Sequence, residues 1–303
     1  MKIFVTGGNG FVGSHLVNRL HVAGHHVRVY DNRAEFTARL FAGVNYIQAD
    51  LLNATALIQA MRDCEMVYHL AANADVRHGP EHTHLDTEQN LIGTQNVLEA
   101  MHANDIHAIA FTSTASVYGE PKVFPTPEDT PMPIQTSLYG ASKLAAEGLI
   151  QAYSAAFGIQ AWIFRLCGIL GERYSHGHVL DFYRQLHEHP TRLIVQGDGN
   201  QIKSYLYIQD CIDAMLIAVE MAQADVNIFN VSHTETCTVK DSIGWITNQL
   251  DLNPTIEFTG GKRGWIGDSP RIQPNNQKMR LLGWRPNLTI RQAVEQTVQY
   301  LKE

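Results

Sequence analysis

The sequence is poor in the features that mark secreted, membrane-embedded or nucleic-acid-binding proteins. It has only four cysteines in 303 residues, and none of them form a C-x-x-C pair. This scatter disfavours a disulfide framework and indicates reduced, mostly buried thiols. No stretch approaches the roughly 18 consecutive apolar residues that a membrane-spanning helix needs. We therefore expect a protein that is neither disulfide-stapled nor embedded in a membrane.

Positive charge is scarce as well. The chain has 23 Lys and Arg against 30 Asp and Glu, which gives a net charge of -7. This balance disfavours nucleic acid as the main partner, so an anionic ligand must be held by local groups. The first apolar run, Ile3 to Val5, ends in glycines and lacks the length of a signal-peptide core. The sequence thus predicts a cytoplasmic location.

Histidine is frequent, with 15 copies, and close pairs occur at 82 and 84, 176 and 178, and 187 and 189. Third and fourth ligands at the usual spacings are missing. We interpret these pairs as surface residues and predict no metal site.

Strand and helix signals alternate through the first half of the chain. Apolar runs predict strands over 2–6, 26–30, 45–49, 66–70, 108–112 and 159–165, and helical spacing predicts helices over 11–23, 54–62, 84–103 and 139–157. Such alternation predicts an α/β fold of the Rossmann type, with a doubly wound parallel sheet covered on both faces. Ligands of such sheets bind beyond the carboxyl ends of the strands.

The second half is less regular. A proline-rich loop over 113–138 is long enough to suggest a function, and after residue 166 short elements are punctuated by glycine. We expect a dinucleotide-binding domain over 1–165, with returning segments around 204–232. Residues 166–303 are expected to form most of a smaller, mixed α/β substrate lobe.

The most informative segment is the glycine-rich turn that follows the first predicted strand. Gly7, Gly10 and Gly13 give the spacing G-x-x-G-x-x-G, and helical spacing starts immediately afterwards. A strand, a tight turn and a helix N-terminus in this order suit the pyrophosphate of a dinucleotide. Asp31 ends the second strand, where a carboxylate can accept hydrogen bonds from both adenine-ribose hydroxyls and repel a 2′-phosphate. NAD is therefore favoured over NADP. The nearby Arg33 is the one feature against this preference, because an arginine could bind a 2′-phosphate.

A tyrosine and a lysine form the strongest catalytic signal. Tyr139 and Lys143 are four residues apart at the start of a predicted helix, so their side chains share one face. A nearby ammonium group, together with an oxidised nicotinamide, favours the phenolate and moves the phenol pKa toward the working pH of a general base.

Together these motifs resemble the extended short-chain dehydrogenase/reductases, and most of all the UDP-glucose 4-epimerase family, over essentially the whole chain. The matching segments are 6–13, 31–32, 69–72, 90–94, 112–119, 139–143 and 283–286. The resemblance implies that Tyr139, Lys143 and Thr114 are catalytic, with Thr114 hydrogen-bonded to O4 of the sugar. The expected NAD-binding residues are Gly7, Gly10, Phe11, Val12, Gly13, Asp31, Asn32, Asp50, Leu51, Leu70, Ala71, Ala72, Asn90, Ser113, Tyr139 and Lys143.

The resemblance also implies a nucleotide-sugar site in the second lobe. The expected substrate-binding residues are Thr114, Ser116, Tyr139, Arg173, His178, Val179, Lys203, Arg263 and Asp268. Lys203 stands where many relatives have an arginine, and lysine keeps the charge but loses the bidentate fork. Gly168 stands where many relatives have an asparagine. Because a contact to the sugar or phosphate can differ there, the resemblance does not fix the identity of the sugar. Arg173 could meet either a diphosphate or a C6 carboxylate.

The predicted function is an NAD-dependent 4-epimerase that inverts C4 of a UDP-hexose through a 4-keto intermediate. Dehydratases of the superfamily place an acidic pair directly after the position of Thr114, and decarboxylases place a glutamate nearby, whereas this chain has Ala115 and Ser116. Both UDP-glucose/UDP-galactose and UDP-glucuronate/UDP-galacturonate remain open as substrates. The alternatives are a nucleotide-sugar reductase or dehydratase, and a non-catalytic dinucleotide-binding protein. Relatives often pair through a four-helix bundle, so we expect a homodimer built on 84–103 and 139–157.

Overall fold

The computed structural model describes residues 1–34, 43–74, 76, 79, 81–131, 134–265 and 267–303, so positions 132 and 133 of the predicted loop lie outside it. The described chain divides into two compact units. The first comprises Met1–Val117, Leu138–Arg165 and Met215–Phe229, and the second comprises Tyr118–Ser137, Leu166–Ala214 and Asn230–Glu303. Segment 118–137, which lies within the range predicted for the cofactor domain, clusters with the second unit, and the returning segment is 215–229.

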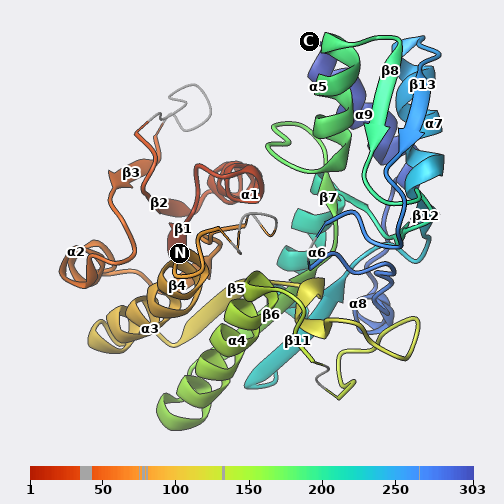
Figure 1. Cartoon of the computed structure of the whole chain (residues 1–303). Coiled ribbons are helices and arrows are strands. Elements are labelled where there is room, and N and C mark those ends of the chain that lie inside the picture. Colours follow the sequence, from red (N-terminus) through yellow and green to blue (C-terminus); the bar gives the residue numbers. More distant parts are fainter. Residues whose placement is uncertain (35–42, 75, 77–78, 80, 132–133, 266) are drawn as a thin grey trace. The chain divides into compact units, whose positions relative to one another are not determined.

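A seven-stranded sheet forms the centre of the first unit (Figure 1), in the order β11-β6-β5-β4-β1-β2-β3. The pairs β1–β2, β1–β4, β2–β3 and β4–β5 are all parallel. The order reverses on the two sides of β1, so the sheet is doubly wound and has its switch point between β1 and β4. This confirms the predicted Rossmann-type fold. The strands are β1 (Lys2–Thr6), β2 (His26–Asp31), β3 (Asn45–Gln48), β4 (Met66–His69), β5 (Ala108–Thr114), β6 (Gln160–Leu166) and β11 (Val226–Val231).

Helices bury apolar side chains against both faces of this sheet. Phe4 of β1 shares a core cluster with Leu98 and Ile150, which come from two helices that lie side by side. Successive strand residues point to opposite faces, so the equally buried Val5 faces the other way. The helices are α1 (Phe11–Val22), α2 (Ala54–Ala60), the π-helix η1 (Thr87–Ile92), α3 (Gly93–Ala103), the 3-10 helix η2 (Ala115–Tyr118), α4 (Leu138–Phe157) and α6 (Ile208–Met221), which leads from the second unit into the first.

The predicted helix over 84–103 differs from the structure in its first turns. The helix starts at Leu85, is π-helical from Thr87 to Ile92, and is then continued by α3. Insertions of this kind are often found at functional sites, because they re-aim side chains without ending the helix. Here the π-helical turn carries Gln89 and Asn90, whose side chains serve the site described below.

The second unit is a mixed α/β body with its own core. Its strands pair in twos, with β13–β8 and β10–β7 parallel and β12–β9 antiparallel. The core gathers Leu170, Val179, Leu193, Ile246 and Val294. The elements are β7 (Ile169–Leu170), α5 (His178–Glu188), β8 (Arg192–Val195), β9 (Ile202–Lys203), β10 (Leu206–Tyr207), β12 (Cys237–Thr238), α7 (Val239–Leu250), β13 (Thr255–Phe258), α8 (Gln277–Leu281) and α9 (Ile290–Lys302). In the described part of the chain no helix is long and apolar enough to cross a membrane.

Candidate active site

The glycine turn joins β1 to α1 through two close backbone contacts. Gly7 has a φ of 67°, and a Cβ atom there would lie 2.5 Å from the backbone nitrogen of Ala71. A Cβ atom on Gly13 would lie 2.1 Å from the carbonyl oxygen of Gly7. Only glycine therefore allows the turn to approach both α1 and the segment after β4. Gly10, the N-cap of α1, makes no side-chain cap, which suits backbone binding of an anion.

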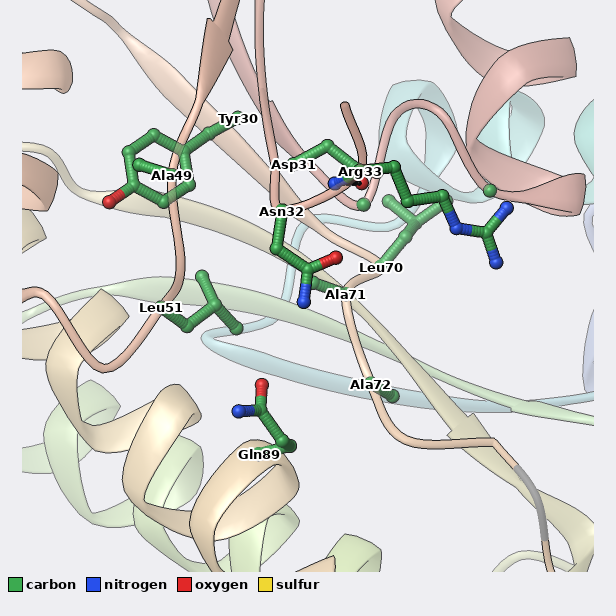
Figure 2. A pocket seen from close by; sticks show the side chains of 12 residues that line it. Tyr30, Asp31, Asn32, Arg33, Ala49, Leu51, Leu70, Ala71, Ala72 and Gln89 are labelled. Carbon is green, nitrogen blue, oxygen red and sulfur yellow. Dashed lines mark hydrogen bonds between the residues drawn. The ribbon is translucent and has the colours of Figure 1, made fainter. Parts of the chain in front are cut away.

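A pocket opens beside this turn at the carboxyl ends of β1, β2 and β4 (Figure 2), with a cavity volume of about 150 Å³. Asp31 lies on its wall and is 7% exposed. Its two carboxylate oxygens accept hydrogen bonds from the backbone nitrogens of Asn9, at 2.9 Å, and Arg33, at 3.0 Å. Asp31 thus fixes the glycine turn and keeps lone pairs available for a ligand.

Most of the cofactor residues predicted near the turn line this pocket. The lining includes the predicted Gly7, Gly10, Asp31, Asn32, Leu51, Leu70, Ala71 and Ala72, together with Tyr30, Arg33, Ala49 and Gln89, which were not on the predicted list. Gln89 carried no sequence signal, because its inward direction depends on the π-helical turn. Phe11, Val12, Gly13 and Asp50 are not among the lining residues. Asp50 instead supports the wall, since its carbonyl accepts from the Tyr30 hydroxyl at 3.0 Å.

Asn90 and Ser113 have side chains committed to other protein groups. The Asn90 amide accepts from the Asn73 backbone nitrogen at 2.8 Å and donates to the Ser142 hydroxyl at 3.0 Å. It thereby ties the segment after β4 to α4, while its expected contact with NAD stays a prediction. The Ser113 hydroxyl donates to the Glu147 carboxylate at 2.5 Å, so its side chain faces α4. The expectation that Ser113 binds the cofactor stays a prediction.

Tyr139, Lys143 and Thr114 all belong to the first unit. Tyr139 is half-buried, while Lys143 is only 1% exposed and holds its ammonium group 4.2 Å from the centroid of the Phe111 ring. Among the described residues, the Lys143 ammonium makes no hydrogen bond and no ion pair, so its donors remain available to a ligand. The Thr114 hydroxyl contacts Ser116 twice, accepting from its nitrogen at 3.1 Å and donating to its Oγ at 3.2 Å. The end of β5 and helix η2 are thereby held together.

Burial dominates the acid–base properties of the pair. It raises the pKa of Tyr139 to about 12, with a smaller contribution from Asp86, while hydrogen bonding to Thr114 opposes the rise. It lowers the pKa of Lys143 to about 7, and the carboxylate of Glu147 opposes the fall. The sequence predicted that Lys143 helps to lower the phenol pKa, and for the protein alone the direction is the opposite. Desolvation of the phenol is the largest cause of this rise.

In the second unit the structure brings together Lys203, Arg263 and Asp268. The buried Lys203 ammonium donates to the Asp268 carboxylate at 2.5 Å and to the Ser269 carbonyl at 2.6 Å. Arg263 pairs with Glu120 and donates to the Asp268 carbonyl at 3.4 Å. Lys203 is thus neutralised by Asp268, which leaves Arg263 as the more exposed cation of this group.

The remaining predicted substrate residues, Val179, His178 and Arg173, differ in burial and in their contacts. Val179 is fully buried in the core of the second unit, so the prediction that it lines a substrate site is wrong. His178 stacks on Tyr205, with ring centroids 4.6 Å apart, and shares a hydrogen bond of 2.8 Å with Ser242. Burial lowers the pKa of His178 to about 3, with Lys203 contributing, so this ring is neutral and offers no charge to an anion. Arg173 is half-buried in the loop after β7, with a φ of 64°.

In the described part of the chain no group of three or more His, Cys, Asp or Glu side chains could hold a metal ion.

A family model supplies the deciding comparison. Residues 3–232 match the model of the NAD-dependent epimerase/dehydratase family. The chain belongs to this family. The match covers the glycine turn, the pocket, the Tyr139–Lys143 pair and Lys203, but not Arg263 or Asp268. The pocket fits the NAD that this family uses, because small residues face the glycine turn and a carboxylate lies at the end of β2.

Individual relatives carry more than one activity within the family. The chain is 30% identical to the UDP-glucose 4-epimerase of Halalkalibacterium halodurans, with 100% of this chain and 96% of that protein covered. It is 29% identical to UDP-glucuronic acid decarboxylase 1 of Arabidopsis thaliana, with 98% of this chain and 69% of that protein covered. The solved UDP-glucuronic acid 4-epimerase of Bacillus cereus, in complex with UDP-glucuronic acid and NAD, superposes with a TM-score of 0.91 at 29% identity and covers 100% of this chain and 99% of that one. The family therefore uses NAD on UDP-sugars in more than one way.

Proposed function

We propose that this protein is an NAD-dependent UDP-sugar 4-epimerase. One observation carries the proposal: a phenol and an ammonium group lie four residues apart on α4, and the ammonium makes no hydrogen bond to the described protein. This arrangement suits a base that works beside a bound dinucleotide. Epimerase relatives at 29–30% identity over the whole chain support the same conclusion.

Each of the three proposed catalytic residues has its own role in inverting C4. Bound NAD supplies the capacity to accept and return a hydride, together with a positive charge that favours the phenolate. Tyr139 takes the proton from the sugar 4-hydroxyl and later returns it. Thr114 orients O4 by hydrogen bonding, and Lys143 donates to the nicotinamide ribose while its charge stabilises the phenolate. Because the oxidation is reversed within one turnover, no net cofactor is consumed.

Elimination and decarboxylation are less well supported by the residues around Thr114. Ala115 and Ser116 follow it directly, and Ala115 is buried. Neither side chain can act as an acid or base at C5 or at a C6 carboxylate. We propose inversion at C4 rather than loss of water or of carbon dioxide, with UDP-glucose/UDP-galactose and UDP-glucuronate/UDP-galacturonate as the substrate pairs.

The proposed function is tested by incubating the purified protein with a panel of UDP- and dTDP-sugars and reading the products by NMR. We expect equilibration of C4 epimers of a UDP-sugar without added NAD. Formation of a pentose, of a 4-keto-6-deoxy sugar, or of stoichiometric reduced cofactor would contradict the proposal.

Asp31 is expected to decide between NAD and NADP. In Asp31→Asn one side-chain oxygen remains to hold the turn, but the negative charge that repels a 2′-phosphate is lost. Hydrogen bonds to charged groups contribute about 1.5–3 kcal/mol, so we expect the NAD-over-NADP preference to fall about 10–100-fold. Titration of cofactor-stripped protein with both dinucleotides measures this ratio, and an unchanged ratio would remove Asp31 from the ribose site.

We further propose a cytoplasmic homodimer that pairs through a four-helix bundle of α3 and α4. These helices lie side by side, and α4 exposes Leu138 and Phe157, at 42% and 41%. Light scattering, compared with the protomer mass of 33.9 kDa, measures the oligomeric state.

A further inference from the structure

A second cavity lies within the second unit and has no part in the chemistry proposed above. Its volume is about 400 Å³, a size typical of small-molecule sites. None of its lining residues is among the predicted cofactor or substrate residues, although segment 283–286 supported the family resemblance. The lining comes from two stretches of this one unit and consists of His233, Thr234, Glu235, Arg280, Arg285, Pro286, Asn287, Leu288 and Thr289.

Hydrogen bonds hold the wall of this cavity in place. Asp210 on α6 is 2% exposed, and its carboxylate accepts from the backbone nitrogen and the side-chain amide of Asn287, at 3.1 and 2.7 Å. The Asp210 carbonyl accepts from the Trp284 indole at 3.0 Å. Arg285 donates through Nη1 to the carbonyl oxygens of Arg280 and Trp284, at 2.6 and 2.7 Å. The loop after α8 is therefore fixed in a shape that leaves the cavity open.

His233 supplies a hydrogen-bond donor to the cavity. The residue is 6% exposed, and its Nδ1 accepts from the backbone nitrogen of Glu235 at 2.9 Å. This hydrogen bond places the proton of the neutral ring on Nε2. Within the described ranges Nε2 makes no hydrogen bond, and it is not sealed in the core, so it faces the cavity that the ring lines. A donor on so deeply buried a side chain needs a ligand or water as its partner.

Positive charge dominates the lining. Arg280 and Arg285 contribute two guanidinium groups, and Glu235 contributes the single carboxylate among the lining residues. That carboxylate is directed to the start of α9, where it accepts from the Ile290 nitrogen at 3.4 Å. In the described part of the chain the Arg280 side chain makes no hydrogen bond or ion pair, and Arg285 uses only Nη1. Guanidinium groups with free donors suit the oxygens of a phosphoryl group.

We propose that this cavity binds the phosphoryl group of a small molecule, held by the guanidinium groups of Arg280 and Arg285 and by Nε2–H of His233. The net positive lining stands out in a chain whose net charge is -7, where an anion must be held by local groups. Pro286 and Leu288 add apolar surface to the same lining, so a compact organic part of a phosphate ester fits there as well as the free ion.

The test is calorimetric titration of the NAD-saturated protein with inorganic phosphate and with phenyl phosphate, at an ionic strength held constant with chloride. We expect Arg280→Gln to weaken the binding of both probes about tenfold or more, because a charge-assisted hydrogen bond is lost. Arg291→Gln is the matched control. Arg291 is also an exposed arginine, but it pairs with Glu295 on α9 and does not line the cavity, so we expect a change of less than about twofold.

A third variant separates this cavity from the group around Lys203. Arg263→Gln removes the more exposed cation of that group, and we expect the phosphate affinity of the cavity to stay unchanged. Affinity lost in Arg263→Gln but kept in Arg280→Gln would move the ligand to that group and overturn the proposal. Equal weakening by Arg280→Gln and Arg291→Gln, or no phosphate binding to the wild type, would also overturn it. Tighter binding of phenyl phosphate identifies a phosphate ester as the ligand, and equal binding identifies the free ion.

Discussion

The Tyr139→Phe variant is expected to retain NAD and lose almost all epimerase turnover. The substitution keeps the half-buried ring in α4 but removes the only group of the proposed mechanism that exchanges a proton with the sugar 4-hydroxyl. General acid–base catalysis contributes about 10²–10⁴-fold, so we expect kcat to fall about 10³-fold. The measurement pairs steady-state kinetics with the NAD content of the purified variant.

Tyr30→Phe is the matched control for this variant. It also removes one phenol hydroxyl from the first unit, but this hydroxyl donates to the Asp50 carbonyl at the wall of the pocket. Loss of one such hydrogen bond is expected to change kcat by less than about tenfold. If Tyr139→Phe and Tyr30→Phe retained similar activity, Tyr139 would not be the base.

Gly13→Ala is expected to produce a protein without bound NAD. The added methyl group would lie 2.1 Å from the Gly7 carbonyl oxygen and 2.8 Å from the Gly8 Cα, which are both backbone atoms. Helix α1 must therefore move away from β1, and the turn that faces the pyrophosphate opens. Overpacking of this kind costs about 1–3 kcal/mol of stability. Cofactor released by denaturation, quantified by chromatography, and the melting temperature measure the two effects.

Gly148→Ala provides the comparison on another helix. Gly148 lies on the exposed side of α4, and a Cβ atom there would meet nothing within 4 Å. Because glycine is a poor helix former, we expect this variant to be stabilised by about 0.5–1 kcal/mol and to keep its NAD. Wild-type NAD content in Gly13→Ala would show that the turn does not need this close approach.

Local patterns in the sequence predicted the sheet well. Each predicted strand of the first half, 2–6 for example, is found within two residues of its predicted end, because alternating strand and helix signals reflect local hydrophobic periodicity. The glycine turn and Asp31 were likewise predicted, since their role follows from their place at strand ends.

Features that depend on distant contacts could not be predicted in the same way. Lys203 meets Asp268 across 65 positions, and Glu147 meets Arg165 from a neighbouring strand. Val179 was assigned from the resemblance alone, which does not show that this residue of α5 packs into the core of the second unit. The rise in the pKa of Tyr139 in the protein alone could not be predicted either, because helical spacing reports neighbours and not desolvation.

The central claim is that one carbon of the sugar is oxidised and then reduced again by the same hydrogen. The direct test uses a UDP-sugar deuterated at C4, incubated with the holoenzyme in ordinary water, with NMR and mass spectrometry of the products. The account predicts that both C4 epimers keep their deuterium at C4 and that no hydrogen from water enters C4 or C5. Loss of the C4 label to water, or exchange at C5, would contradict it.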